Sequence, residues 1–348
     1  MNRTATIALA PFSALYSAAV KARSTGYEKR FLKTHTVSVP VLSVGNITVG
    51  GTGKTPLVQW LAEHLASGGR KVCILSRGYR RDNAKNQVVV SDGEHILSDV
   101  AQSGDEAMML AQSLLGKSAV LCNADRASAA QWAIDHLKSD VLLLDDGFQH
   151  RRLARDLDIV TIDATNPFGN GRLLPAGILR EPIHSLSRAD CTVLTRVSAA
   201  GATDLIDHIR PVTDAPVFQS RTVIKRFHRL NSSDSASDFA EIEQPLGAFC
   251  GIGNPNAFFD QLHAAHLDVR HETAFRDHHK YSQGDIDRLV EQATAKGAQA
   301  LITTAKDSVK LQSLRFDLPC FVAQIEVEVS DDTKLLELVQ QAIDKKAN

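Results

Sequence analysis

The residues with the clearest chemical potential form a glycine-rich segment, TVGGTGKT, at positions 48–55. Its glycines allow backbone N–H groups to approach phosphate oxygens closely. Lys54 supplies a cation for the β and γ phosphates of ATP, and the Thr55 hydroxyl suits Mg²⁺. The segment therefore predicts a phosphate-binding loop of the P-loop type, which consists of Thr48, Val49, Gly50, Gly51, Thr52, Gly53, Lys54 and Thr55.

Two departures bear on the class of this loop. The strict P-loop spacing requires a glycine where this chain has Thr48, which lowers the specificity of the match. Partition and septum-site ATPases carry a signature lysine at the position of Val49, so its absence argues against that class. An apolar run before the loop and helical spacing after it favour nucleotide binding over a chance glycine run.

Two carboxylates follow another apolar run, VLLL at 141–144. Asp145 and Asp146 end this predicted strand, where a Walker B carboxylate holds Mg²⁺ directly or through water. A pair of acids in a strand-terminal turn is the alternative. Gln149 is a candidate to order a water or a metal ligand, whereas a solvated loop position explains His150 equally well.

Candidate acid–base residues occur in two further segments. Asp105 opens a predicted helix, where the helix dipole alone favours acidic residues, so its spacing favours the structural explanation. Asp277 and His278 suggest a general base with a carboxylate that orients it. Neighbouring side chains of extended backbone point in opposite directions, so Asp277 need not be that carboxylate. His263 and His266 fit surface or core positions rather than a zinc site.

The composition narrows the class of protein. A length of 348 residues predicts about two domains, and 43% hydrophobic with 23% charged residues is typical of a globular chain. The net charge of −1 and the few tryptophans and tyrosines argue against a nucleic-acid partner. The five cysteines form no CxxC pair, which indicates a reducing compartment rather than a disulfide framework.

Residues 1–35 stand apart from the rest of the chain. Positions 6–20 carry no charge, but the run is shorter than the roughly 20 residues that span a bilayer, and Pro11 interrupts it. No clear cleavage site follows. Against a single acid, Glu28, the basic residues of this segment are Arg3, Lys21, Arg23, Lys29, Arg30 and Lys33. This pattern predicts a peripheral or monotopic anchor on anionic lipid. A helix packed on the protein's own surface is the alternative.

Apolar runs alternate with helical spacing along residues 36–220. Strands are expected at 39–44, 72–75, 87–90, 119–122, 141–144, 158–162 and 191–194, and helices at 56–66, 105–115 and 127–137. The alternation predicts an α/β fold of the P-loop NTPase type, in which helices cover a mostly parallel sheet. Ligands bind such sheets beyond the carboxyl ends of the strands, where the candidate segments lie.

The pattern changes near residue 220, and residues 221–330 predict a second, smaller α/β domain. It has strands at 246–251 and 300–304 and a polar loop at 231–243. The segments 216–225 and 320–329 alternate in hydrophobicity, and we expect them to pair as linker strands. The final helix, within residues 331–348, would then return to the domain of residues 36–220.

Seven segments, taken in order, resemble a known family, the tetraacyldisaccharide 4′-kinases of the lipid A pathway. They are VGNITVGGTGKTP (44–56), LSRGYR (75–80), GDEA (104–107), DDGFQH (145–150), GRLLPAGILREP (171–182), DHH (277–279) and TTAKD (303–307). The segments DDGFQH and GRLLPAGILREP are far more specific than a P-loop.

The resemblance implies a kinase at the cytoplasmic face of a bacterial inner membrane. It would transfer the γ-phosphate of ATP to the 4′-hydroxyl of a tetraacyldisaccharide 1-phosphate and form lipid IVA, with no obligatory protein partner evident. Asp105 and His278 would form a base dyad supported by Asp277, and Lys54 would serve the nucleotide. The residues implied around Mg²⁺ are Thr55, Asp145, Asp146, Gln149 and Glu181.

Other assignments remain open from the residues alone. The substrate's 1-phosphate, ATP or structural ion pairs each account for the arginines Arg77, Arg80, Arg126, Arg172 and Arg180. A soluble small-molecule P-loop kinase is the first alternative function. A nucleotide-dependent switch that acts by binding a protein partner is the second.

Overall fold

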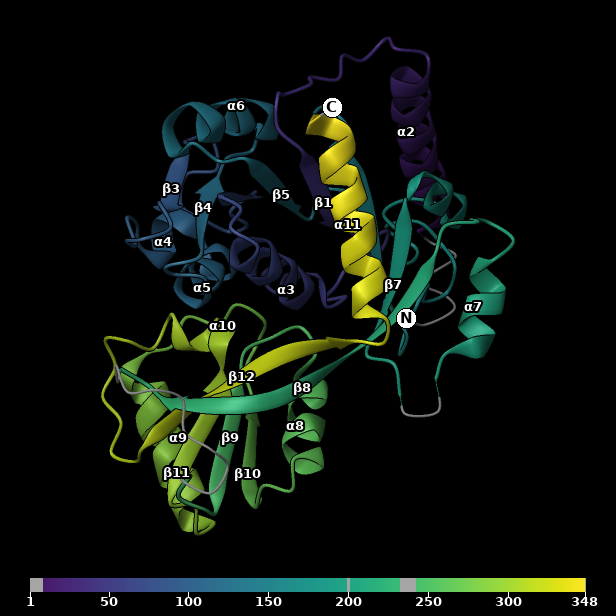
Figure 1. Cartoon of the computed structure of the whole chain (residues 1–348). Coiled ribbons are helices and arrows are strands. Elements are labelled where there is room, and N and C mark those ends of the chain that lie inside the picture. Colours follow the sequence, from purple (N-terminus) through teal and green to yellow (C-terminus); the bar gives the residue numbers. More distant parts are fainter. Residues whose placement is uncertain (1–8, 199–200, 232–241, 348) are drawn as a thin grey trace.

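The structure of the chain, a computed structural model, describes residues 9–198, 201–231 and 242–347. Within these residues the fold is α/β, with a mostly parallel sheet in the order β10-β9-β11-β12-β8-β7-β6-β1-β5-β2-β4-β3 (Figure 1). The predicted fold class is confirmed. Most of the predicted loop at 231–243 lies outside the described residues.

The strands are β1 (Val41–Gly45), β2 (Val72–Ser76), β3 (Val88–Ser91), β4 (Ser118–Cys122), β5 (Val141–Asp145), β6 (Leu157–Asp163), β7 (Cys191–Thr195), β8 (Val217–Arg229), β9 (Leu246–Cys250), β10 (Val269–Ala274), β11 (Ala300–Thr304) and β12 (Cys320–Val329). The helices are α2 (Ala10–Glu28), α3 (Lys54–Ser67), α4 (Val100–Ser103), α5 (Asp105–Ser113), α6 (Arg126–Leu137), the 3₁₀ helix η1 (Ile183–Arg188), α7 (Thr203–Ile209), α8 (Pro255–Ala264), α9 (Gln283–Ala295), α10 (Ala305–Ser308) and α11 (Asp332–Ala347).

Strand β1 lies between β5 and β6, and both pairs are parallel. Helices cover both faces, which explains why these strands are continuous apolar runs. Alternate residues of β5 face opposite cores: Leu143 packs with α3, α5 and α11, and Leu144 packs with α6. The carboxyl ends of β1 and β5 therefore lie side by side, with Val44 opposite Asp145.

A long two-stranded ribbon joins the two halves of the sheet (Figure 1). Strand β8 begins parallel to β7 and continues antiparallel to β12, in a register that places Val329 opposite Ser220. The chain then enters α11, where Leu335 and Val339 belong to the same buried cluster as Leu61 of α3. The last helix thus lies against the helices and strands that follow the phosphate loop.

Beyond the ribbon, β9, β10 and β11 are parallel to one another and have helices on both faces. Phe258 and Leu262 of α8 pack on one side, and Ile286 and Leu289 of α9 pack on the other. The carboxyl ends of β9, β10 and β11 lead into the segments at 251–254, 275–280 and 304–308. These three segments carry the polar residues of the second half of the site.

Helix α2 lies along the surface, and none of its residues is buried. It is attached through Ser13, which donates to the Leu173 carbonyl at 2.7 Å, and Tyr16, which donates to the Arg180 carbonyl at 3.0 Å. Leu15 keeps 71% of its surface exposed. Across the described ranges, no helix combines the length and apolarity needed to span a membrane.

Candidate functional site

The phosphate loop connects the end of β1 to the start of α3, and neighbouring strands hold its backbone in place. The Thr52 hydroxyl lies 2.8 Å from the Thr161 hydroxyl, and the Thr195 hydroxyl donates to the Thr52 carbonyl at 2.9 Å. Gly53 caps α3 with φ of 72°, where a Cβ atom would lie 3.2 Å from the Thr195 side chain. The left-handed conformation therefore favours glycine there, and any side chain would also make a tight contact with Thr195.

Most of the predicted loop faces a cavity. Positions 49–55 line it, whereas Thr48 is buried behind them and accepts a hydrogen bond from the Asn46 amide. Arg196 donates to the Gly51 carbonyl and pairs with Asp163. This arginine lies just after β7, and the sequence patterns did not identify it as a site residue.

The acidic end of β5 lies beside the loop, as its pairing with β1 requires. Lys54 Nζ is 3.5 Å from Asp146 Oδ1, and Arg180 Nη1 is 2.8 Å from Asp146 Oδ2. The Asp145 carboxylate is buried at the cavity wall, with the Ser76 hydroxyl at 3.4 Å. The lysine and the two carboxylates thus meet at adjacent strand ends.

The two aspartates differ in electrostatic surroundings. Burial, with the charges of Glu106 and Asp146 nearby, raises the pKa of Asp145 to about 7. Burial would also raise the pKa of Asp146, but the charges of Lys54 and Arg180 outweigh it and lower that pKa. The basic neighbours of Asp146 therefore stabilise its negative charge, whereas the cations near Asp145 do not offset its burial.

Gln149 and Glu181 contact each other at the same edge. Gln149 Nε2 donates to Glu181 Oε1 at 3.0 Å and to the Asn46 carbonyl at 2.9 Å, and Arg188 pairs with Glu181 at 2.8 Å. Glu181 lies behind the cavity wall, while the other predicted metal-site residues line the cavity: Thr55, Asp145, Asp146 and Gln149. Within the described ranges, no group of three or more His, Cys, Asp or Glu residues is arranged to hold a metal ion.

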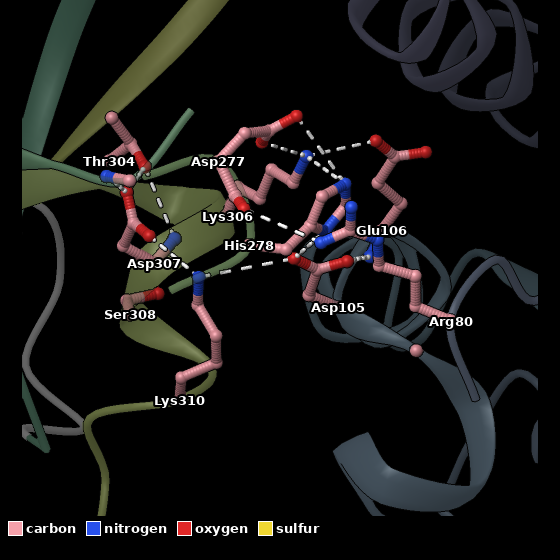
Figure 2. A network of polar contacts seen from close by, with 12 residues as sticks. Arg80, Asp105, Glu106, Asp277, His278, Thr304, Lys306, Asp307, Ser308 and Lys310 are labelled. Atoms are coloured by element: carbon pink, nitrogen blue, oxygen red, sulfur yellow. Dashed lines mark hydrogen bonds and ion pairs between the residues drawn. The ribbon is translucent and has the colours of Figure 1, made fainter. Parts of the chain in front are cut away.

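A histidine and an aspartate from opposite halves of the chain form the second polar group (Figure 2). His278 Nδ1 lies 2.7 Å from Asp105 Oδ2, although 173 residues separate them. Asp105 is the first residue of α5, and His278 lies in the loop after β10 with φ of 60°. Asp277 Oδ2 is 3.6 Å from the other ring nitrogen, so the residue adjacent in sequence is not the closest carboxylate.

The sequence assigned no role to several charged residues that contact Asp146 or the His278–Asp105 pair. Lys306 of α10 lies 3.0 Å from Glu106 and 3.4 Å from both Asp277 and His278. Its only sequence signal was its place in the TTAKD segment. Arg180 emerges as the partner of Asp146, because only the folded chain brings residue 180 to the end of β5.

The other arginines considered from the sequence have separate environments. Arg77 lines the cavity, and Arg80 donates to the Asp277 carbonyl at 3.4 Å. Arg126 is buried and donates to the Asp145 carbonyl at 3.4 Å, and burial lowers its pKa. Arg172 is exposed and lines a second, smaller cavity beside α2. His150 is half-buried, and burial lowers its pKa to about 4.

One cavity of about 1720 Å³ connects the two polar groups. Its wall runs from Lys54 and Asp145 at the strand ends of the first half to Glu106, His278 and Lys306. Such a cavity accommodates two substrates at once, one on the phosphate loop and one beside the His278–Asp105 pair. The arrangement suits transfer of a phosphoryl group between them.

Comparison with known proteins identifies the family of the chain. A family model described as tetraacyldisaccharide-1-P 4′-kinase matches residues 5–344. A relative named tetraacyldisaccharide 4′-kinase from Geobacter metallireducens is 37% identical over 346 residues, which cover 99% of each chain. A relative of the same name from Geobacter sulfurreducens is 38% identical over 342 residues, covering 96% of this chain and 91% of the relative.

The fold agrees with a solved structure as well. LpxK from Aquifex aeolicus, described as an "apo" form in complex with ATP, superposes with a TM-score of 0.79 at 34% identity and covers 97% of this chain and 99% of its own. The family resemblance predicted from the seven sequence segments is confirmed. Since the family model and these relatives extend over nearly the whole chain, the protein belongs to the tetraacyldisaccharide-1-phosphate 4′-kinase family.

Proposed function

We propose that this protein is an ATP-dependent kinase that phosphorylates the 4′-hydroxyl of tetraacyldisaccharide 1-phosphate and forms lipid IVA. The observation that carries the proposal is the shared cavity, in which a phosphate loop with Lys54 faces the His278–Asp105 pair. Family membership supplies the identity of the acceptor, since the relatives carry that name. Phosphoryl transfer depends chiefly on positioning and charge neutralisation, which this wall provides.

The nucleotide binds along residues 48–55 in this proposal. Backbone N–H groups of the glycine-rich turn and the N-terminus of α3 receive the phosphates, as in other P-loops. Lys54 contacts the β and γ phosphates, and its present ion pair with Asp146 holds its ammonium group at the loop. Arg196 also lines the cavity and donates to the Gly51 carbonyl, which places a second cation beside the loop.

Residues at the same edge fit Mg²⁺, a cation that prefers oxygen ligands and keeps several waters beside one or two carboxylates. Asp145 is the favoured ligand, because burial raises its pKa to about 7 and a divalent cation would offset that burial. Thr55 offers a hydroxyl. At the same edge, Gln149 contacts Glu181, and Asp146 pairs with Arg180. When bound, Mg²⁺ neutralises charge on the phosphates.

The acceptor's 4′-hydroxyl lies beside His278 in this proposal. Its oxygen forms a bond to the γ-phosphorus while the bond from that phosphorus to the bridging oxygen breaks and ADP leaves. The hydroxyl proton passes to His278, whose other ring nitrogen is held by the Asp105 carboxylate. Asp277 supports the pair from the opposite side of the ring at 3.6 Å.

A membrane-bound acceptor also accounts for the outward face of α2. Phe12 and Leu15 are 62% and 71% exposed, and the basic residues Lys21, Lys29, Arg30 and Lys33 accompany them along the segment. We propose that this segment contacts the anionic cytoplasmic surface of the inner membrane as a peripheral anchor.

The decisive experiment incubates the protein with γ-labelled ATP and tetraacyldisaccharide 1-phosphate and scores the product by mass. We expect a lipid product that gains one phosphoryl group and carries the label. A parallel incubation supplies water-soluble sugars as acceptors. If a sugar becomes labelled there and no lipid product forms, the protein is the alternative small-molecule kinase. ATP hydrolysis without any labelled acceptor would instead support a nucleotide switch. Lys54→Ala provides the matched inactive control.

A further inference from the structure

Lys306 is the residue of the site for which neither the sequence motifs nor the proposed mechanism has supplied a role. Its ammonium group lies among three acceptors: Glu106 Oε1 at 3.0 Å, Asp277 Oδ1 at 3.4 Å and His278 Nε2 at 3.4 Å (Figure 2). A lysine ammonium has three N–H donors. The three contacts therefore use all of its hydrogen-bonding capacity, and one of them ends on the ring of the proposed base.

The contact with the ring specifies which nitrogen of His278 carries the proton. An ammonium group has no lone pair, so it contacts Nε2 favourably only when that nitrogen is unprotonated. The other nitrogen, Nδ1, lies 2.7 Å from the Asp105 carboxylate, which accepts and cannot donate. Together the two contacts favour the neutral ring with its proton on Nδ1 and a free lone pair on Nε2.

The alternative tautomer has a weaker set of contacts. A proton on Nε2 would point toward Asp277 Oδ2 at 3.6 Å, which is beyond ordinary hydrogen-bond length, and toward the Lys306 ammonium at 3.4 Å. It would also leave Nδ1 and Asp105 as two acceptors facing each other at 2.7 Å. Geometry alone therefore selects the Nδ1–H form.

Lys306 also balances the charge around the ring. Three carboxylates, Asp105, Glu106 and Asp277, lie in this cluster and favour a doubly protonated imidazolium. The opposing cations are Lys306, next to Nε2, and Lys310 of the segment after α10, whose Nζ is 3.9 Å from Asp105 Oδ2. The Tyr79 ring, from the loop after β2, lies 5.9 Å from the imidazole, and Arg80 of the same loop contacts the Asp277 carbonyl.

Both ionic partners keep their charges. Burial would lower the pKa of Lys306, but Glu106, Asp105 and Asp277 outweigh it and raise that pKa. Burial would raise the pKa of Asp105, but the hydrogen bond from His278 and the charge of Lys306 outweigh it and lower that pKa. The cation and the carboxylate on either side of the ring thus persist across the neutral range.

Gly251, just after β9, connects the segments that carry His278 and Lys306, because it contacts His278 and Asp307, the residue after Lys306. The His278 N–H donates to the Gly251 carbonyl at 3.1 Å, and the Gly251 N–H donates to Asp307 Oδ2 at 2.9 Å. Asp307 is fully buried and also accepts from the Thr304 hydroxyl and from Lys310, at 2.8 Å each. These bonds hold the two backbone segments side by side, and Glu106 of α5 contacts Lys306 from the other half of the chain.

We propose that Lys306 is a positioning residue that holds His278 neutral, with Nε2 unprotonated and free to accept the proton of the acceptor hydroxyl. The incoming hydroxyl replaces Lys306 at Nε2, and the ammonium group remains on Glu106 and Asp277. This role rests on the proposed kinase reaction for its use in catalysis. The protonation state itself exists without any substrate, which allows the two ideas to be tested separately.

The first experiment is ¹⁵N NMR of the whole protein labelled at its 13 histidines, with His278 assigned by the signal lost in His278→Gln. At pH 7 without substrate, we expect a protonated Nδ1 and an unprotonated Nε2. In Lys306→Met the cation next to Nε2 is lost while the three carboxylates remain, so we expect the ¹⁵N signal of Nε2 at pH 7 to move toward that of a protonated nitrogen. A wild-type ring with its proton on Nε2 would overturn the proposal, whatever the activity of the protein.

The second experiment is the pH dependence of kcat and kcat/KM with the lipid acceptor. In Lys306→Met we expect the acid limb to move to higher pH and activity to recover at alkaline pH, because the base must lose its extra proton first. Lys306→Arg keeps the charge, so its acid limb stays near that of the wild type even where kcat falls. Lys296→Met removes an exposed lysine outside the cavity wall and controls for net charge.

If Lys306 only stabilises the packing of α5 against α10, the expected results differ. In that case Lys306→Met lowers kcat by the same factor at every pH, the ¹⁵N signals of the His278 ring do not move, and Lys306→Arg loses as much activity. That set of results would reject the proposal. Thermal unfolding and nucleotide affinity of each variant establish that the fold and the phosphate loop are intact. Failure of the kinase assignment would appear instead as no phosphorylated lipid from wild-type protein.

Discussion

Asp145 and Asp146 are adjacent in the chain, yet burial raises the pKa of Asp145, whereas Lys54 and Arg180 outweigh burial and lower the pKa of Asp146. Arg180 and Lys54 lie 2.8 and 3.5 Å from Asp146, whereas the closest hydrogen-bond partner of the Asp145 carboxylate is the Ser76 hydroxyl at 3.4 Å. The left-handed backbone of Asp146, with φ of 55°, turns the second carboxylate toward the basic residues. Two identical side chains can therefore have separate functions.

Replacement of Asp145 is expected to stabilise the protein and to abolish its activity. Its folded pKa of about 7 lies above the ordinary aspartate value, so the ionised carboxylate destabilises the metal-free protein. This cost is fully present above pH 7 and shrinks as the pH falls toward the unfolded-state value. Asp145→Asn should therefore raise Tm by several degrees at pH 8 and by less at pH 5, while turnover is lost. Calorimetry in EDTA measures the first effect.

Asp146→Asn is the matched comparison, because it removes a carboxylate that basic residues already stabilise. Burial alone would raise its pKa, but Lys54 and Arg180 lower it, so its ionised form adds stability above the unfolded-state pKa. We expect a lower Tm at neutral pH, and a smaller deficit as the pH falls through the folded-state value. Equal Tm changes in the two variants would contradict the electrostatic difference between them.

The dyad and the phosphate loop should separate kinetically. His278→Ala is expected to lower kcat by about 10²–10⁴-fold, because proton removal from the acceptor is lost, and to leave ATP affinity unchanged. Lys54→Ala should abolish turnover by disturbing the nucleotide phosphates. Equilibrium binding of an ATP analogue and single-turnover rates distinguish the two patterns. A nearly normal kcat in His278→Ala would remove this histidine from the mechanism.

Gly45 should tolerate no side chain. A Cβ atom there would lie 2.5 Å from the Cβ atom and 2.6 Å from the backbone nitrogen of Phe148. Gly45→Ala is expected to destabilise the fold by about 1–3 kcal/mol and to displace the 145–149 segment, which lowers activity. A Cβ atom at Gly284, in α9, would have nothing within 4 Å, and the backbone there is helical, so Gly284→Ala should stabilise by about 0.5–1 kcal/mol. Denaturant unfolding compares the two.

Flotation with anionic liposomes tests the membrane contact of α2. We expect liposome binding to weaken as the salt concentration rises, because the basic side chains within residues 21–33 contribute to it. Binding should weaken further in Phe12→Ser and Leu15→Ser, which remove exposed apolar side chains. Leu97→Ser changes an exposed leucine outside this segment and should leave flotation unaltered. If the two α2 variants float as well as the wild type, α2 is not the contact; flotation independent of salt would make apolar insertion the main contribution.

The sequence by itself determined the class of fold and predicted which residues form the first half of the site. Local patterns were enough, because the apolar strands, the glycine turn at 50–53 and the acids after VLLL are each encoded within a few neighbouring residues. The parallel pairing of β1 with β5 then places Lys54 and Asp146 together almost by necessity. The seven family segments added the reaction.

Only the tertiary structure decided which charges meet. Asp105 had a sufficient local explanation at a helix start, and its partner His278 lies 173 residues away across the cavity. Lys306, Arg180 and Arg196 likewise acquire their partners through long-range packing that no local period encodes. Electrostatic interactions depend on the distance between charges in space and on their burial. The spacing of residues along the chain predicts neither quantity.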